Sequence, residues 1–203
     1  NYHENRGSAQ CKSSIIFAGL RTEGTTIIKA KKSRNHTEIL FKYLKIPIKI
    51  IKKKDFDFIE IFGEKNYMAF NYNVPSDISS SAFFIVLTLL SENSNLIIKN
   101  ININPGRIGS IKILNKMGAK IRFKNIKHYK GEKIADIYVQ SAKSLKGINV
   151  PKKFNSSAID EFLILFLAAA KAKGTSYFND LSELNKKESP RLNIAVNFLK
   201  KIG

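Results

Sequence analysis

The chain has 203 residues, of which 43% are hydrophobic, so it can bury a core without disulfides or metal ions to hold it together. Its single cysteine, Cys11, excludes an internal disulfide and favours a reducing compartment. The longest apolar runs are too short to cross a bilayer, so we expect a globular, cytoplasmic protein with no membrane partner.

The formal net charge of +19 favours anionic partners. Clustered basic side chains would indicate a nucleic-acid-binding module, because they release counterions from a phosphate backbone. Only six of the 35 basic residues are arginine, and the lysines are scattered among isoleucine and asparagine without interleaved aromatic residues. We therefore expect no nucleic-acid partner, and a basic binding module stays open only as an alternative.

Residues 8–62 read as the first of three copies of one structural unit. Their hydrophobic periodicity predicts a helix over 13–20, a strand over 25–30, a helix over 37–44, and strands over 46–51 and 56–62. A serine-rich segment precedes the first helix, and Arg34 lies just before the second.

The second copy begins at Ser76, directly after Pro75, which forces the residue before it into an extended conformation. It predicts a helix over 79–90, a strand over 96–103, a helix over 108–117, and strands over 119–123 and 135–140. Arg107 lies before the second helix, and Gly118 is expected to end it in a left-handed conformation. We place a domain boundary at Pro75–Ser76.

The third copy begins at Ser156 and stops before its last two strands. It predicts a helix over 158–172, a strand over 175–179 and a helix over 192–202, with Arg191 at the start of the last helix. Because the chain opens at Asn1 and closes at Gly203, directly after a predicted helix, we expect a fragment of a longer protein.

The candidate catalytic and anion-binding residues lie in the third copy, where acidic residues precede an apolar helix and basic residues follow it. The acids of the segment Asp160-Glu161 could move protons, and the bases Lys187 and Arg191 could bind an anion. Structural roles are the alternative: Asp160 could cap its helix, Lys187 and Arg191 could face water, and Glu188 could pair with either of them.

Six sequence words occur in order along the chain. They are Ser8-Ala9-Gln10 with Lys12-Ser13, Ser33-Arg34-Asn35-His36-Thr37-Glu38, Val74-Pro75-Ser76-Asp77-Ile78-Ser79-Ser80, Asn104-Pro105-Gly106-Arg107, Ile159-Asp160-Glu161, and Lys187-Glu188-Ser189-Pro190-Arg191-Leu192. Together they closely resemble the 5-enolpyruvylshikimate-3-phosphate synthase family, the enolpyruvyl transferases of the shikimate pathway. The likeness covers essentially the whole chain.

The resemblance implies an α/β (α+β) fold of repeated βαβαββ units, three in each of two lobes, of which this chain is an incomplete part. Residues 1–74 would be the end of the first lobe and residues 75–203 the first part of the second. The hinge would lie near Pro75–Ser76, and the family's active site lies in the cleft between the lobes.

The resemblance also implies a reaction. The family transfers the enolpyruvyl group from phosphoenolpyruvate to the 5-hydroxyl of shikimate 3-phosphate and releases phosphate, on the route to aromatic amino acids. We expect a monomer that binds these two small anions and uses no cofactor and no metal, since the three histidines have no second ligand at a metal-binding spacing.

Through these sequence words, the functional positions of the family can be matched to residues of this chain. Shikimate 3-phosphate would be bound by Ser8, Ala9, Gln10, Arg34, Asp160 and Lys187, and phosphoenolpyruvate by Gln10 and Arg191. The catalytic pair would be Asp160, which takes the proton of the 5-hydroxyl, and Glu188, which exchanges a proton with the methylene carbon. A guanidinium suits phosphate because its planar fork forms two parallel hydrogen bonds.

Further ligands of the family, including an N-terminal lysine and arginine, a glycine-rich loop and a late arginine and lysine, lie outside this chain. We therefore expect the fragment alone to be inactive. The alternative within the fold is a sister enolpyruvyl transferase that acts on a nucleotide-sugar. Its nucleophilic-cysteine loop is not visible in the sequence, and the words at Ser8 and Lys187 fit shikimate better.

Overall fold

The computed structural model describes residues 1–63 and 67–202, so residues 64–66 and Gly203 lie outside the described part. The chain divides into two compact units. The first consists of Asn1–Val74 with His128–Glu132, and the second of Pro75–Lys127 with Lys133–Gly203. Each unit has its own hydrophobic core, so each is described by itself.

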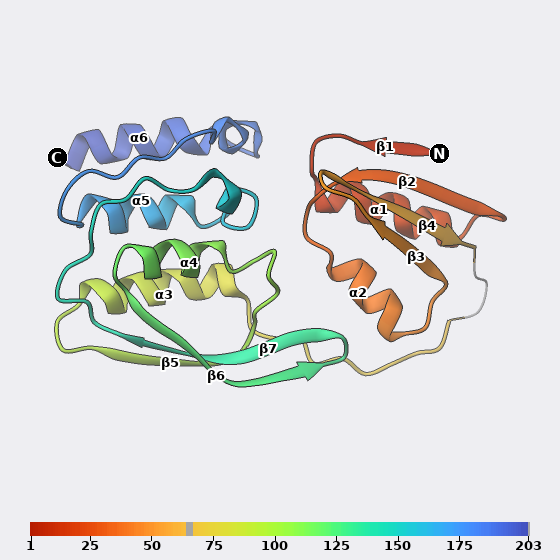
Figure 1. Cartoon of the computed structure of the whole chain (residues 1–203), viewed down its shortest axis with the longest axis horizontal. Helices are drawn as coiled ribbons and strands as arrows, with labels where there is room; N and C mark the ends of the chain where they lie inside the picture. Colours follow the sequence, from red (N-terminus) through yellow and green to blue (C-terminus); the bar gives the residue numbers. More distant parts are fainter. Residues whose placement is uncertain (64–66, 203) are drawn as a thin grey trace. The chain divides into compact units, whose positions relative to one another are not determined.

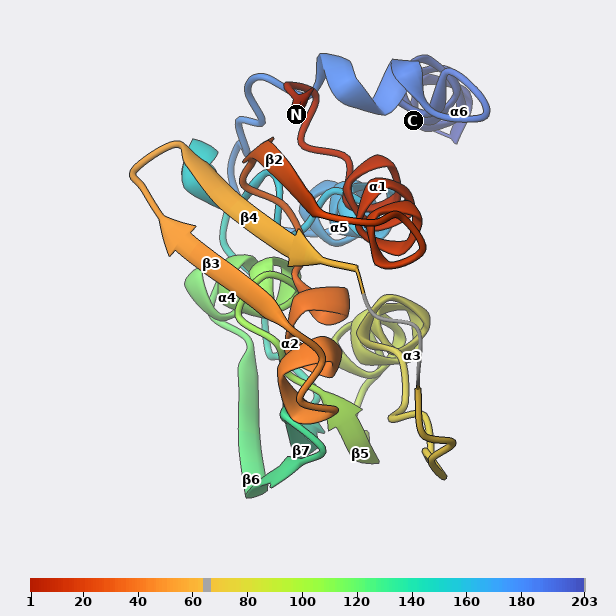
Figure 2. The ribbon, with the colours of Figure 1, turned by 90° about the vertical axis from the view of Figure 1, so that its right-hand side faces the viewer.

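The first unit contains one mixed sheet and two helices (Figure 1). Its elements are β1 (Tyr2–Glu4), α1 (Ala9–Leu20), β2 (Thr25–Lys31), α2 (His36–Tyr43), β3 (Ile48–Lys52) and β4 (Phe56–Phe62). The strand order is β1-β2-β4-β3, and β1 runs parallel to β2 while the other neighbours are antiparallel. Figure 2 shows β2, β4 and β3 side by side.

Both helices of the first unit pack against one face of this sheet. Ile28 of β2 and Ile59 of β4 lie opposite each other and point to that face. Ile16 of α1 and Phe41 of α2 complete the same buried cluster. The alternation of buried and exposed residues along β2 and β4 is typical of strands with one covered face.

The second unit stacks helices on a three-stranded sheet of order β5-β7-β6. Its elements are α3 (Ile78–Leu90), β5 (Asn95–Asn102), α4 (Gly109–Lys116), β6 (Lys120–Tyr129), β7 (Glu132–Gln140), the 3-10 turn η1 (Lys152–Phe154), α5 (Phe162–Ala170), the 3-10 turn η2 (Ser182–Lys186) and α6 (Arg191–Ile202). In Figure 1, α3 and α4 lie against the sheet, and α5 and α6 form further layers beyond them. Only the tip of the β6–β7 hairpin, His128–Glu132, belongs to the first unit.

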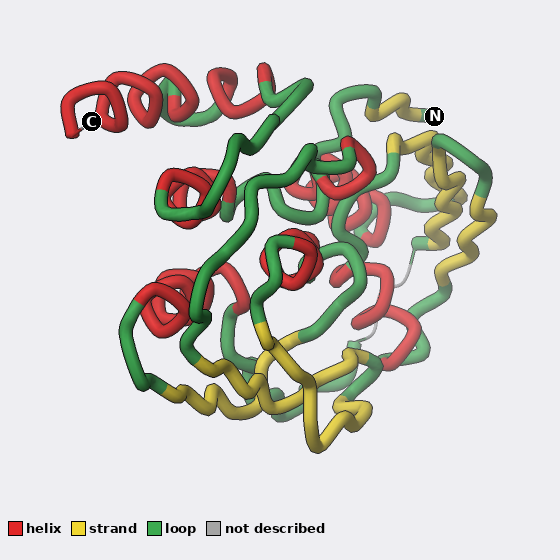
Figure 3. The backbone as a smooth tube through the Cα atoms, turned by 60° about the vertical axis from the view of Figure 1, so that its left-hand side comes forward, coloured by secondary structure: helices red, strands yellow, loops and turns green. Residues whose placement is uncertain are grey.

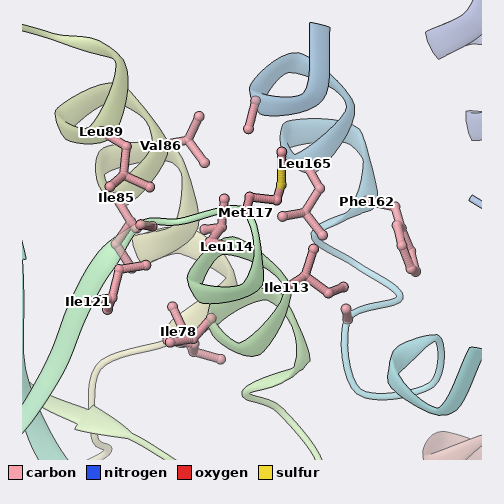
Figure 4. Packing of buried hydrophobic residues seen from close by; sticks show 14 of the residues in the cluster. Ile78, Ile85, Val86, Leu89, Ile113, Leu114, Met117, Ile121, Phe162 and Leu165 are labelled. Atoms are coloured by element: carbon pink, nitrogen blue, oxygen red, sulfur yellow. The ribbon is translucent and has the colours of Figure 1, made fainter. Parts of the chain in front are cut away.

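The core of the second unit is centred on the packing of α3, α4 and α5. Met117 follows α4 and lies between Val86 of α3 and Leu165 of α5 (Figure 4). Its side chain is fully buried, and an unbranched thioether can fill the irregular space between three helices. Gly118 follows with φ +96, so the left-handed helix end predicted at this position is confirmed.

The strand pairing confirms the repeated α/β fold. In the second copy, Ser76 pairs in parallel with Ile101 of β5, just as β1 pairs with β2 in the first copy. The resulting order, Ser76 segment-β5-β7-β6, repeats the order β1-β2-β4-β3. The first and second copies therefore each carry a short leading strand segment ahead of the first helix, which completes the βαβαββ pattern in both.

The third copy departs from the prediction, because the strand expected over 175–179 is not regular. Lys146 and Asn149 form isolated parallel bridges with Lys173 and Tyr177. Gly174 interrupts this ladder with φ +86, and the Ser176 hydroxyl accepts the backbone N–H of Ile148 in place of a carbonyl. Figure 3 shows the segments around α5 as loops for this reason. The strand prediction was wrong: among the described residues this segment forms only isolated parallel bridges, whereas β2 and β5 each also pair with an antiparallel strand.

A β-bulge interrupts β5, which overlaps the segment predicted as a strand over 96–103. The register shifts between Ile98 and Ile101, and Asn100 has φ 53 and donates its N–H to the Asp136 carboxylate. The extra residue lets Ile98 and Ile101 both contact the core, although three positions separate them.

Close approach of two copies requires glycine at position 109, and this can be tested by substitution. A Cβ on Gly109 would lie 2.7 and 2.8 Å from the carbonyl carbon and oxygen of Ser157. We expect Gly109→Ala to lower the free energy of unfolding by about 1–3 kcal/mol, measured by urea denaturation, because backbone must move. Gly106→Ala is the control, since its Cβ would meet only the Asn104 side chain at 3.2 Å. Equal losses in both variants would contradict this explanation.

Candidate active site

In the first unit, the predicted phosphate ligands lie at the start of α1. Ser8 is the N-cap of the helix, and its hydroxyl accepts the N–H of Cys11 at 3.2 Å. Ala9 and Gln10 form the first turn, and Gln10 is exposed. Because the first turn carries no acidic residue, its backbone N–H groups present a positive end to an anion.

The loop before α1 is organised by Glu4, a residue that the sequence analysis missed. Its carboxylate is almost fully buried and accepts the backbone N–H groups of Arg6, Gly7 and Ser8 at 2.8, 2.9 and 3.2 Å. Gly7 has φ +78, which allows the tight turn that brings these N–H groups together. Glu4 thus fixes where Ser8 begins the helix.

A buried ion pair holds Arg34 near this helix start. The Lys12 ammonium lies 2.6 Å from the Glu38 carboxylate and donates to the Arg34 carbonyl oxygen at 2.7 Å. The side chains of Lys12 and Glu38 are only 3% and 4% exposed. One lysine therefore ties the first turns of α1 and α2 to the segment that carries the half-buried Arg34.

The ion pair can be tested by removing one or both partners. We expect Lys12→Met to lower the free energy of unfolding by about 3–5 kcal/mol, because it leaves the Glu38 carboxylate buried without a counter-charge. The double variant Lys12→Met with Glu38→Leu is the control and is expected to recover most of that loss. Urea denaturation of the chain measures both. A double variant that is no more stable than the single one would contradict this account.

In the second unit, two predicted carboxylates converge on Arg191, the first residue of α6. The guanidinium lies 2.6 Å from Glu188 and 3.7 Å from Asp160. The side chains of Asp160 and Arg191 are each 28% exposed. Glu161, rather than Asp160, occupies the N-cap position of α5, and the Glu161 side chain makes no capping hydrogen bond there.

Lys187 lies beside this cluster rather than within it. Its ammonium is 3.7 Å from Glu183 of η2, and its side chain is 28% exposed. It follows η2 directly, so the 3-10 turn and the start of α6 together position the whole Lys187-Glu188 word. A half-exposed ammonium that is held by a loose ion pair can exchange its partner for an anionic ligand at low cost.

The pKa of Glu188 is lowered below its usual value. Its own backbone N–H is the largest cause, followed by the hydrogen bond and the positive charge of Arg191, and then by Lys187. Glu188 is therefore ionised at neutral pH. An anion that draws Arg191 away from it would raise its pKa, so that a larger fraction of Glu188 would carry a proton that it can donate.

Because Arg191 and Lys187 both lower the pKa of Glu188, substitution of either residue should raise that pKa, but to different extents. We expect Arg191→Ala to raise the pKa of Glu188 more than Lys187→Ala does, because Arg191 lowers that pKa through both a hydrogen bond and its charge. Titration of the Glu188 side-chain carboxyl by NMR measures the shift in each variant. A larger rise in Lys187→Ala than in Arg191→Ala would show that Arg191 is not its main side-chain partner.

The structure thus gathers the predicted residues into two groups, one in each unit. Ser8, Ala9, Gln10 and Arg34 lie at the helix starts of the first unit, and Asp160, Lys187, Glu188 and Arg191 at those of the second. That both groups of residues line one active-site cleft stays a prediction, and so do the roles of the individual residues. Glu4, Lys12 and Glu38 were missed as supports. The only sequence signal for them was that Lys12 and Glu38 lie within the matching words.

No helix in residues 1–63 and 67–202 is long and apolar enough to cross a membrane. In the same residues, no three His, Cys, Asp or Glu side chains gather as ligands of a metal ion.

Solved structures share this fold. The EPSP synthase of Acinetobacter baumannii matches 98% of this chain and 44% of its own length, with a TM-score of 0.87 and 38% identity. The enolpyruvyl transferase NikO of Streptomyces tendae matches 81% of the chain with a TM-score of 0.58, and at 16% identity this shows the fold alone. The architecture is that of the enolpyruvyl transferases.

The chain belongs to the EPSP synthase (3-phosphoshikimate 1-carboxyvinyltransferase) family, whose sequence model matches residues 1–203. Relatives named 3-phosphoshikimate 1-carboxyvinyltransferase include those of Caldicellulosiruptor bescii, 41% identical over 197 residues, and Legionella pneumophila, 39% identical over 204 residues. The chain spans 45% and 46% of their lengths. The family resemblance drawn from six sequence words is thus confirmed.

Proposed function

We propose that the protein to which this chain contributes transfers the enolpyruvyl group of phosphoenolpyruvate to the 5-hydroxyl of shikimate 3-phosphate and releases phosphate. The observation that carries the proposal is the cluster of Asp160, Glu188 and Arg191, which holds two carboxylates against one guanidinium. It occurs in a chain that matches the EPSP synthase family over its whole length.

The reaction needs the two carboxyl side chains of this cluster in different protonation states. A hydroxyl becomes a competent nucleophile when a carboxylate within hydrogen-bond reach takes its proton, which is the role we assign to Asp160. Glu188 exchanges the proton of the methylene carbon, and Arg191 binds phosphoenolpyruvate. Two carboxyls that share one arginine, at 2.6 and 3.7 Å, have different environments and can divide the acid and base roles.

The remaining assignments concern substrate binding. Ser8, Ala9, Gln10 and Arg34 bind shikimate 3-phosphate together with Lys187, and Gln10 also contacts phosphoenolpyruvate. A helix start with free N–H groups and a capping hydroxyl supports the phosphate assignment at Ser8.

The proposed arrangement of the protein completes this picture. Residues 1–74 and 75–203 belong to two lobes with a hinge at Pro75–Ser76, in a monomeric, cytoplasmic enzyme. The exposed, unpaired Cys11 is compatible with a reducing compartment.

The activity can be tested in a chimera in which residues 1–203 replace the matching segment of the Caldicellulosiruptor bescii relative. We expect this chimera to release phosphate from the two substrates and Asp160→Asn to lower kcat by about 100-fold or more, the usual contribution of a general base. A coupled phosphate assay measures both.

The matched control is Asp180→Asn, which alters an exposed carboxylate of the same unit that pairs with Lys152. Its positive φ of 59 suits asparagine, so the backbone is not strained. We expect its kcat to equal that of the unmodified chimera. Full activity of the Asp160→Asn chimera would remove Asp160 from its assigned role.

A further inference from the structure

Arg107, which precedes the second helix of the second copy, is bonded through its Nη2 to the start of the first helix, α3. Its Nη2 donates to the Asp77 carboxylate and to the Ser79 hydroxyl, both at 2.7 Å. Asp77 in turn is the N-cap of α3, and the Arg107 side chain is only 16% exposed. The guanidinium thus holds the first turn of α3 to the loop before α4.

The hydroxyl of Ser79 connects Arg107 to a residue of the third copy. It accepts the Arg107 hydrogen bond and donates its own proton to the Glu161 carboxylate, which uses both capacities of a hydroxyl. Glu161 is 3% exposed, so its ionised form depends on such partners. Arg107, Ser79 and Glu161 therefore form a continuous hydrogen-bonded chain inside one unit.

Glu161 is covalently joined to Asp160, the proposed proton acceptor. The Glu161 carbonyl accepts the first backbone bond of α5 from Leu165, and its N–H donates to Ala158. Because the side chain, N–H and carbonyl of Glu161 are all bonded, the backbone next to Asp160 is anchored at this point. Asp160 itself is held across space by Arg191 at 3.7 Å, which is too long for a direct hydrogen bond.

We propose that Arg107, Ser79 and Glu161 are positioning residues that fix the location of Asp160 for proton removal. This inference rests on the proposed function. The three residues act by anchoring the backbone next to Asp160, so that its carboxylate stays within reach of the reacting hydroxyl. Such anchoring matters because a misplacement of about 1 Å at a reacting group can cost about 100-fold in rate.

The test is the Ser79→Ala variant of the chimera described above. We expect kcat to fall about tenfold or more while KM for both substrates changes less than about threefold, since the lost contact positions a catalytic group and touches no substrate. Ser79→Thr keeps the hydroxyl and is expected to restore kcat. Ser91→Ala is the matched control, because that hydroxyl, at the end of the same helix, bonds the Leu87 carbonyl.

A double-variant experiment separates positioning from general damage to the fold. In the Asp160→Asn background, Ser79→Ala is expected to cause no further fall in kcat, because it acts through Asp160. Glu161→Gln is a second variant that keeps the side-chain size, and it is expected to reproduce the kcat loss of Ser79→Ala.

The outcomes distinguish this inference from the function on which it rests. A chimera that releases no phosphate overturns the proposed function and the positioning network together. An active chimera in which Ser79→Ala keeps the parental kcat overturns the network alone. The network is equally overturned if Ser79→Ala lowers kcat by the same factor with and without the Asp160 carboxylate.

Discussion

Parallel pairing of the two strand segments that flank the first helix of each copy is the constraint on which the structure depends. It joins β1 to β2, Ser76 to Ile101, and Lys146 to Lys173. Because parallel strands end at the same edge, both helices that follow them begin at that edge. The residues before each first helix therefore meet the residues before each second helix, although more than twenty positions separate them in sequence.

The three copies use that meeting point in three different ways. In the first, Lys12 and Glu38 form a buried pair that stabilises the loop of Arg34. In the second, Arg107 is held by short hydrogen bonds and has a structural role. In the third, Arg191 is half-exposed and holds Asp160 loosely. The loosely held pair of the third copy keeps charge available for a ligand, whereas Arg107 of the second copy does not, so repetition does not make the copies functionally equivalent.

Local pattern was sufficient to predict most elements and the repeat. The strand over 56–62 was predicted with the bounds that β4 has, because alternating apolar residues with turn residues on either side encode a half-buried strand locally. The strand over 175–179 was wrong, since in the described residues its segment forms only isolated parallel bridges and lacks an antiparallel neighbour such as β4 provides for β2. The short strand β1 was missed because three residues carry too little periodicity to be detected.

The sequence by itself determined the family, the repeated α/β architecture, and the candidate residues at helix starts, because these depend on ordered motifs and on periodicity within a few turns of chain. Only the tertiary structure decided the partner of each charge. It placed Lys12 on Glu38, Arg107 on Asp77 and Ser79, and Arg191 between Glu188 and Asp160. The physical reason is that most of these pairs join segments more than twenty residues apart, and packing of the strands and helices between them sets which side chains come within reach.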